Sequence, residues 1–144
     1  MYDTSTNFLN IHEWAYGATE AVHILSLAAA IGFIALIDLQ MLGVGVGATS
    51  ARLLRATGLG SLVGLVIAIT TGFMVFSTDP IRYFNHPTMR FKLVMLVVAI
   101  IFNYSIHDRV AKGDYPARVR RAIASISLLL WVTIVFSGIF YAFT

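Results

Sequence analysis

Four long apolar segments dominate the pattern of hydrophobic and polar positions along the chain. Stretches free of Asp, Glu, Lys and Arg cover residues 21–37, 56–78, 93–107 and 122–144. A bilayer core about 30 Å thick needs about 20 apolar residues in a helix. The first and third stretches reach that length if Glu20, Asp38 and Lys92 lie at their ends, and a long side chain such as that of Lys92 can extend back to the interface. We therefore expect membrane-spanning helices at approximately 19–44, 56–78, 88–108 and 121–143.

The remaining sequence favours an all-α protein. The apolar runs are continuous, whereas a membrane barrel needs short alternating segments. Residues 4–17 mix apolar and aromatic residues with polar ones, which predicts a short helix lying in the membrane interface. Thr19 is a candidate N-cap of the first span, with Glu20 favourable at its positive end. The prediction is an all-α integral membrane four-helix up-down bundle, a single transmembrane domain over residues 1–144, with a short N-terminal interfacial helix.

Composition supports lipid as the main solvent and excludes several other classes. The chain is 58% hydrophobic and 12% charged, against roughly 25% charged residues in soluble proteins. Cysteine is absent, which excludes a disulfide scaffold and a thiolate metal site. The net charge of +3 comes from short basic runs between apolar segments, where headgroups and topology explain it. We expect a lipid bilayer and no nucleic acid as partner.

The ten Lys and Arg residues predict the orientation of the bundle. The second connection holds three of them, Arg82, Arg90 and Lys92. The first and third connections hold the other seven, which are Arg52, Arg55, Arg109, Lys112, Arg118, Arg120 and Arg121. Because cytoplasmic loops carry the excess of basic residues, both termini are expected on the outer side.

The four histidines fall at two levels of the predicted bundle. His23 and His86 lie near the outer surface, with His12 close by in the interfacial segment, and His107 ends the third span on the inner side. The first and third helices run in the same direction, so His23, early in the first, lies level with Lys92, early in the third. Lys92 and His107 are separated by roughly 22 Å along a helix at 1.5 Å per residue, so His23 and His107 should not share one ligand. An ionisable residue inside the membrane is a functional hypothesis by default, and imidazole suits iron, copper and zinc.

The outer level has the chemistry of one b-type haem site. Small residues leave clearance for a planar ring, and basic residues at the interface can pair with haem propionates. The candidate iron ligands are His23 and His86, and the residues expected around the cofactor are Ser26, Ala30, Gly72, Arg82, Arg90 and Lys92. An interfacial hydrogen bond for the histidines, helix packing for the small residues and topology for the basic ones explain the same pattern without a cofactor.

Three further features have a structural interpretation. Gly60 and Gly64 form a GxxxG pair, which predicts close helix packing. Asp38, near the inner end of the first span, is expected to form an ion pair with Arg52, Arg55 or Arg109. Trp131, deep in the fourth span, is expected to pack in the core.

Several segments carry a resemblance to known proteins. They are Glu20-Ala-Val-His23-Ile-Leu, Ile37-Asp38-Leu-Gln40-Met-Leu-Gly43, Thr71-Gly72-Phe-Met-Val-Phe76, His86-Pro87-Thr-Met-Arg90-Phe-Lys92 and Ser127-Leu-Leu-Leu-Trp131. With them the chain resembles a family of uncharacterised four-helix bacterial inner-membrane proteins, and its layout is similar to the broader group of CopD-like proteins and membrane porphyrinogen oxidases. The resemblance implies that His23 ligates a haem, that Lys92 serves the porphyrin site, and that the chain lies in the bacterial inner (plasma) membrane. In that membrane, the orientation predicted from the basic residues makes the N- and C-termini periplasmic. The chain departs from the family at Gln40, where Arg is usual, and at His86, where Asn is usual.

Four functions compete at this stage. The leading hypothesis is a haem b electron-transfer protein at the periplasmic side, which exchanges electrons with a quinone or a periplasmic or membrane redox partner. An enzyme similar to porphyrinogen oxidases is the second. Copper handling is the third, because Met74 and Met89 join the outer histidines and thioether with imidazole suits Cu(I). The fourth is a structural subunit of a larger complex or a homo-oligomer.

Overall fold

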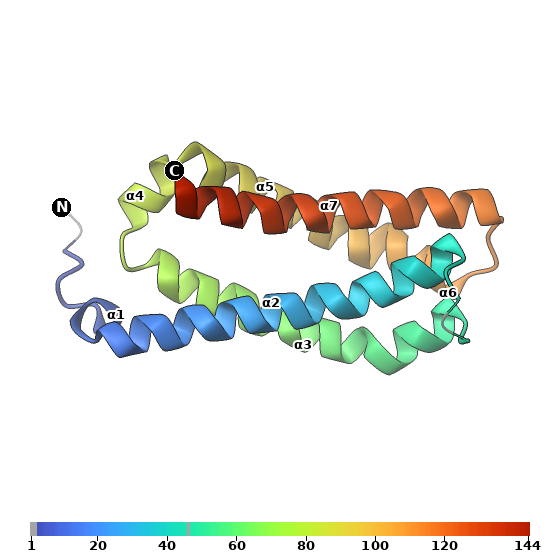
Figure 1. The fold of residues 1–144 in the computed structure, drawn as a ribbon, viewed down its shortest axis with the longest axis horizontal. Helices are drawn as coiled ribbons and strands as arrows, with labels where there is room; N and C mark the ends of the chain where they lie inside the picture. The colour runs from blue at the N-terminus through green and yellow to red at the C-terminus, as the bar shows by residue number, and fades with distance from the viewer. Residues whose placement is uncertain (1–2, 46) are drawn as a thin grey trace.

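The fold is an all-α bundle of four antiparallel membrane-length helices (Figure 1). A computed structural model describes residues 3–45 and 47–144. Its helices are α1 (Phe8–Ile11), α2 (Glu13–Leu42), α3 (Ser50–Phe76), α4 (Pro80–Asn85), α5 (Pro87–Phe102), the π-helical turn η1 (Asn103–His107), α6 (Asp108–Lys112) and α7 (Ala117–Phe143). Four segments are long and apolar enough to cross a membrane, namely α2, α3, the continuous run Pro87–Lys112 and α7. The predicted fold class is confirmed.

The two ends of the bundle differ in chemistry. One end, here called the termini end, holds α1, α4 and both chain termini (Figure 1). The opposite end, here called the arginine end, holds the connections from α2 to α3 and from α6 to α7, with seven of the ten Lys and Arg residues in or beside them. The basic residues are therefore unequally divided between the two ends, as the sequence predicts.

Helices α2 and α3 each begin six residues earlier than the apolar runs predict, at 13 rather than 19 and at 50 rather than 56. The Thr49 side chain caps α3 by accepting a hydrogen bond from the Arg52 amide, which lets the helix begin before the apolar run. Thr19 lies inside α2, where its hydroxyl donates to the Ala15 carbonyl at 2.8 Å. The prediction that Thr19 caps the first span is wrong, because the interfacial segment from Glu13 continues the same helix.

The N-terminal segment forms the short helix α1 and is fixed to the end of α3. Asn7 caps α1 through the Leu9 amide, and its amide group donates to the Ser77 carbonyl at 3.1 Å. Asn10 donates to the Thr78 carbonyl at 3.0 Å. The large apolar side chains Phe8, Ile11 and Trp14 are exposed, as expected of a segment that lies in an interface.

Helices α2 and α3 form the closest pair in the bundle. A Cβ atom added at Gly64 would lie 2.9 Å from the Ser26 carbonyl oxygen and 3.2 Å from the Ala30 Cβ, and one added at Gly60 would lie 2.9 Å from the Phe33 ring. The GxxxG pair therefore packs against α2, as predicted, since only glycine allows this approach.

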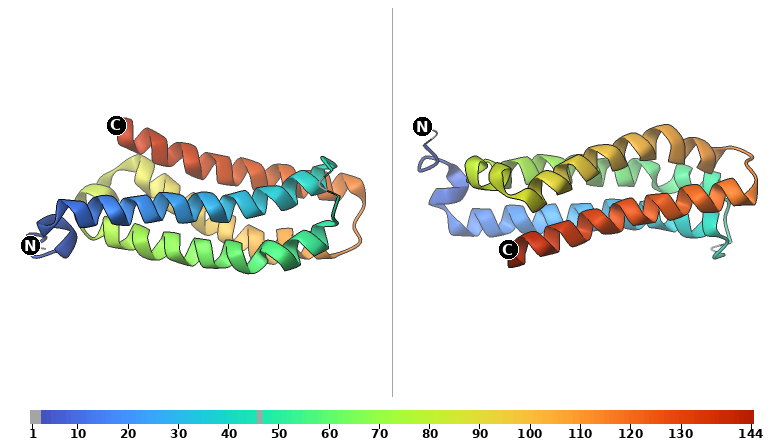
Figure 2. Two further views of the ribbon diagram at one scale, coloured as in Figure 1. Left: turned by 60° about the horizontal axis from the view of Figure 1, so that its bottom comes forward. Right: turned by 90° about the horizontal axis from the view of Figure 1, so that it is seen from above.

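The buried apolar core occupies the middle of the bundle and its arginine end. The middle cluster consists of Ala30, Ile34, Leu65, Ala99, Trp131 and Ile134. The second cluster consists of Ile37, Met41, Leu54, Val110, Ala111 and Ala124. Toward the termini end, the pair α2 and α3 diverges from the pair α5 and α7 (Figures 1 and 2). Neither core cluster extends into the part where the pairs diverge.

Candidate functional site

His23 lies at the divergent termini end and is held from one side by α3. Its Nδ1 atom is 2.7 Å from the Ala68 carbonyl oxygen and 3.4 Å from the Thr71 hydroxyl. Because a carbonyl oxygen only accepts hydrogen bonds, Nδ1 carries the hydrogen and Nε2 carries the lone pair. Nε2 has no hydrogen-bond partner among residues 3–45 and 47–144. The side chain thus presents a free imidazole nitrogen whose tautomer is fixed by the backbone.

Gly72 makes room for this arrangement. A Cβ atom at Gly72 would lie 2.8 Å from Cε1 and 3.1 Å from Nδ1 of His23, so any larger residue would displace the ring. The absence of a side chain at Gly72 therefore leaves room for the His23 ring. The sequence pattern alone predicts only that Gly72 leaves space for a cofactor.

Lys92 approaches the same part of the bundle from α5. Its Nζ atom would lie 3.3 Å from a Cβ atom at Gly138 of α7. Lys92 is near enough to His23 for their charges to interact. Over the described part of the chain, the ammonium group makes no ion pair. A half-buried cation without an anion is expensive in a membrane, which makes Lys92 a candidate site for an anionic group of a ligand.

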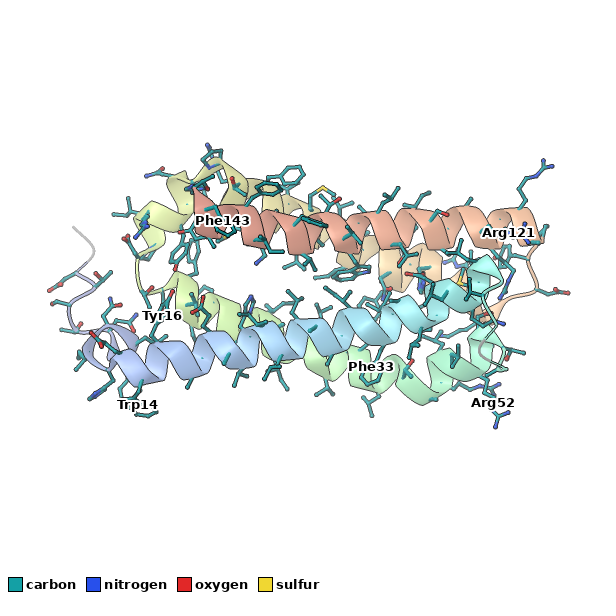
Figure 3. The ribbon with its side chains drawn as sticks, in the orientation of Figure 1. Trp14, Tyr16, Phe33, Arg52, Arg121 and Phe143 are labelled. Carbon is teal, nitrogen blue, oxygen red and sulfur yellow. The ribbon has the colours of Figure 1, made fainter. Side chains whose placement is uncertain are left out.

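Three tyrosines stand nearer the membrane surface than His23 and link the two helix pairs. The hydroxyl groups of Tyr16 on α2 and Tyr83 on α4 are 3.2 Å apart, and Tyr83 stacks on Tyr141 of α7 with ring centroids 5.4 Å apart. Figure 3 shows Tyr16 on the side of α2 that faces α7, and Trp14 on the opposite side. Burial raises the pKa of Tyr83 to about 12, and the hydrogen bond with Tyr16 acts in the same direction. His23 follows Tyr16 by seven residues, or about 10 Å along the helix, so it lies below this tyrosine layer.

The other histidines of the termini end lie apart from His23. His86 occupies the N-cap position of α5 without a capping hydrogen bond from its side chain. Its ring meets that of Tyr141 edge-on, with centroids 4.7 Å apart, and its Nε2 atom lies 3.2 Å from the Thr144 hydroxyl. Its Nδ1 atom is buried with no hydrogen-bond partner in the part of the chain that the structure describes. His12 packs with Phe8 at the exposed surface. The described residues show no hydrogen bond or ring contact between His86 and His23.

The remaining residues expected around a cofactor divide into packing and surface positions. Ala30 is fully buried against Gly64, and the Ser26 hydroxyl donates to the His23 carbonyl at 3.1 Å. Arg82 on α4 and Arg90 on α5 are exposed at the termini end. The structure therefore brings together His23, Gly72 and Lys92, while the two arginines border the same end from outside.

A second polar cluster lies buried near the arginine end. The Nε2 atom of His107 is 2.6 Å from Oδ1 of Asp38, and the Ser127 hydroxyl donates to Oδ2 of Asp38 at 2.7 Å. His107, Asp38 and Ser127 are each fully buried. The expectation that Asp38 pairs with an arginine is wrong, because His107 of η1 and Ser127 of α7 occupy the two oxygens of its carboxylate. Ser127 donates to Asp38 and not to His107, so the trio lacks the serine–histidine contact of a nucleophilic triad.

The π-helical turn η1 presents His107 to Asp38. Its closing hydrogen bond runs from the Asp108 amide to the Asn103 carbonyl, five residues back. The sequence gives no signal for this turn, and the Asp38–His107 contact joins positions 69 residues apart. The available signal was chemical, since two ionisable residues at the same inner level of an apolar bundle need partners.

The described residues hold no group of three or more His, Asp or Glu side chains arranged to bind a metal ion. One axial histidine is enough to ligate a haem iron, so the haem hypothesis depends on His23 rather than on such a group. Comparisons with models of protein families, with curated proteins and with solved structures found no match to this chain. The chemistry of the residues around His23 is therefore the basis for a proposed function.

Proposed function

We propose that this protein binds one haem b at the divergent termini end of the bundle, with His23 Nε2 as the axial ligand, and that it transfers electrons at the outer side of a bacterial inner membrane. The outer side is the termini end, because the arginine end carries the excess of basic residues that favours the cytoplasm. Quinones and periplasmic or membrane redox partners are the corresponding electron donors and acceptors. Bound haem would supply one-electron chemistry.

The geometry of His23 is the observation that carries the proposal. Histidines that ligate metals usually donate their second ring N–H to a carboxylate, a water or a backbone carbonyl, which fixes the tautomer and raises ligand basicity. The Nδ1 contact of His23 with the Ala68 carbonyl at 2.7 Å has this form. Its Nε2 atom has no hydrogen-bond partner in the described chain, as a nitrogen that ligates a metal requires.

The charges at the termini end support an anionic cofactor. Lys92 has no ion-pair partner in the described chain, and a propionate carboxylate would supply one. Arg82 and Arg90 are exposed nearer the membrane surface, where they can pair with a second propionate. His86 engages Tyr141 and Thr144, so the proposal requires only His23 as ligand.

Absorption spectra of the detergent-purified protein test the proposal. The protein is produced with an added haem precursor, and spectra are recorded in the oxidised and dithionite-reduced states, with iron and copper measured on the same sample. We expect a Soret band with about one haem per chain in the wild type and its loss in His23→Ala. The matched control is His12→Ala, which removes an exposed histidine from the same end and should leave the spectrum unchanged.

Two results would overturn the proposal. One is a wild-type protein without a Soret band despite adequate haem supply. The other is a spectrum that stays the same in folded His23→Ala. A change in the His86→Ala spectrum would add a sixth ligand to the proposal and leave the role of His23 in place.

A porphyrinogen substrate is a second candidate for the same site. The unpaired Lys92 ammonium favours it, because such a macrocycle carries carboxylates. With oxygen excluded and a quinone added as the electron acceptor, oxidation of porphyrinogen to fluorescent porphyrin by wild-type protein, with loss of that activity in Lys92→Gln, would favour an enzyme over an electron carrier.

A further inference from the structure

The buried cluster near the arginine end has no part in the proposed haem site. His107 touches a carboxylate with each ring nitrogen: Nε2 lies 2.6 Å from Asp38 Oδ1, and Nδ1 lies 3.3 Å from Asp108 Oδ1. The side chains of Asp38 and His107 are fully buried, and that of Asp108 is 18% exposed. The three groups thus run from the partly exposed Asp108 through His107 to the fully buried Asp38.

The two contacts of His107 leave room for one proton more than these residues carry when Asp is ionised and His is neutral. Ionised carboxylates only accept hydrogen bonds, and a neutral imidazole donates from one nitrogen only. In that state one nitrogen of His107 would place its lone pair against a carboxylate oxygen. One added proton, on the imidazole or on a carboxylate, gives both contacts a hydrogen. A second buried acceptor, Oδ1 of Asn103, has no hydrogen-bond donor in the described chain.

We propose that Asp38, His107 and Asp108 form a proton-binding site inside the membrane region, which is loaded from the arginine end through Asp108. Asp108 takes a proton from water and passes it to Nδ1 of His107. The Nε2–H proton of His107 then moves to Asp38, so one proton enters and the imidazole ends neutral. Ser127 holds the other oxygen of Asp38 through its hydroxyl hydrogen.

The surroundings make the cluster a binding site rather than a path across the membrane. Beyond Asp38 lies the apolar middle cluster, which contains no ionisable group. The charged groups that act on His107 are Asp38 from α2 and Asp108 from α6. From α7, Arg120 points to the Ser50 hydroxyl of α3 at 2.6 Å instead, and Tyr104 of η1 interacts with Asp108.

Nitrogen NMR of histidine-labelled protein in lipid nanodiscs tests the proposal without haem. The His107 signal is assigned as the one lost in His107→Gln, and it is followed over the pH range in which the protein stays folded. In the wild type we expect the signal to change from the Nε2–H tautomer to the Nδ1–H tautomer as the pH falls and the site takes up its proton. Asp38→Asn and Asp108→Asn should each move that transition by about one pH unit or more, since removal of a neighbouring charge has effects of that size. The exposed loop variant Asp114→Asn is the control and should leave it unchanged.

Asp108→Asn also tests the route of entry. It should slow exchange of the His107 ring proton with water about tenfold or more, because it removes the acid that connects the ring to the surface. A His107 signal that does not change with pH in wild-type protein would overturn the proposal. Equal titration in Asp108→Asn and Asp114→Asn would overturn it as well, and this comparison remains available if Asp38→Asn fails to fold. Loss of haem binding in His23 variants would leave these results unaffected.

Discussion

The substitution Gly72→Ala tests whether haem binding depends on the position of the His23 ring against α3. The added methyl group would lie 2.8 Å from Cε1 and 3.1 Å from Nδ1 of His23, closer than carbon atoms approach without displacement. The ring must move away from α3, which breaks the Nδ1 hydrogen bond with the Ala68 carbonyl. A carbonyl that holds the second nitrogen of a metal-ligating histidine orients the ring, and its loss typically lowers affinity 10- to 100-fold, so we expect haem affinity to fall by about that factor.

The effect on stability has three contributions. Loss of one hydrogen bond costs about 1 kcal/mol, and crowding in a packed contact adds about 1–3 kcal/mol. Replacement of a helical glycine by alanine returns about 0.5–1 kcal/mol. We therefore expect Gly72→Ala to lower the free energy of unfolding by about 1–3 kcal/mol, from these terms together.

The assay pairs haem titration with thermal unfolding in the same detergent. Gly32→Ala is the matched control, because a Cβ atom there meets nothing within 4 Å. We expect this control to bind haem as the wild type does and to be at least as stable. Equal haem affinity in Gly72→Ala and Gly32→Ala would refute the proposed role of the Ala68 contact in ligand orientation.

Three further predictions concern the scaffold. Asp38→Ala removes the buried partner of His107 and should lower the free energy of unfolding by about 3–5 kcal/mol, whereas the exposed Asp114→Ala should change it little in the same chemical denaturation; equal effects would contradict a buried pair. Gly64→Leu should separate α2 from α3 and lower the free energy of unfolding by more than about 2 kcal/mol in the same chemical denaturation. The control Gly58→Ala, whose Cβ would make an ordinary contact at 3.4 Å, should be tolerated. A Gly64→Leu bundle as stable as the wild type would show that the two helices are not in close contact. The pKa of Tyr83 is about 12 in the folded protein and has its ordinary value of 10.0 in the unfolded chain. Between these two pH values the unfolded state has lost a proton that the folded state retains, so stability falls as pH rises. The thermal midpoint should therefore fall less steeply over this range in Tyr83→Phe than in the wild type, and equal slopes would contradict the raised pKa.

The sequence predicts the spans well because apolar length alone determines them in a bilayer. The four long helices, the close approach at Gly60 and Gly64 and the buried Trp131 all follow from that constraint. The helix start at Glu13 does not, because an interfacial segment carries polar residues whether or not it continues a helix. Composition therefore locates spans better than it locates their ends.

The partners of polar side chains were harder to predict. Asp38 was expected beside an arginine, but a π-helical turn brings His107 to it. Such a turn depends on how the whole third span packs, and no local residue pattern encodes it. For His23, the sequence predicts a position near the end of the bundle that holds the termini, where the structure also has it, yet only the structure shows that its Nδ1 atom contacts the Ala68 carbonyl.

The turn at Asn103–His107 also divides the third span into two half-helices with different neighbours. Before the turn, α5 packs on α7; after it, α6 contacts α3 as well as α7. A π-helical turn accommodates one extra residue, which rotates everything beyond it by about 100° relative to an uninterrupted α-helix. Deletion of one residue there would restore the α-helix and swing His107 away from α2. One residue of chain length thus sets which face of η1 and α6 turns toward α2, independently of α5, which supplies Lys92.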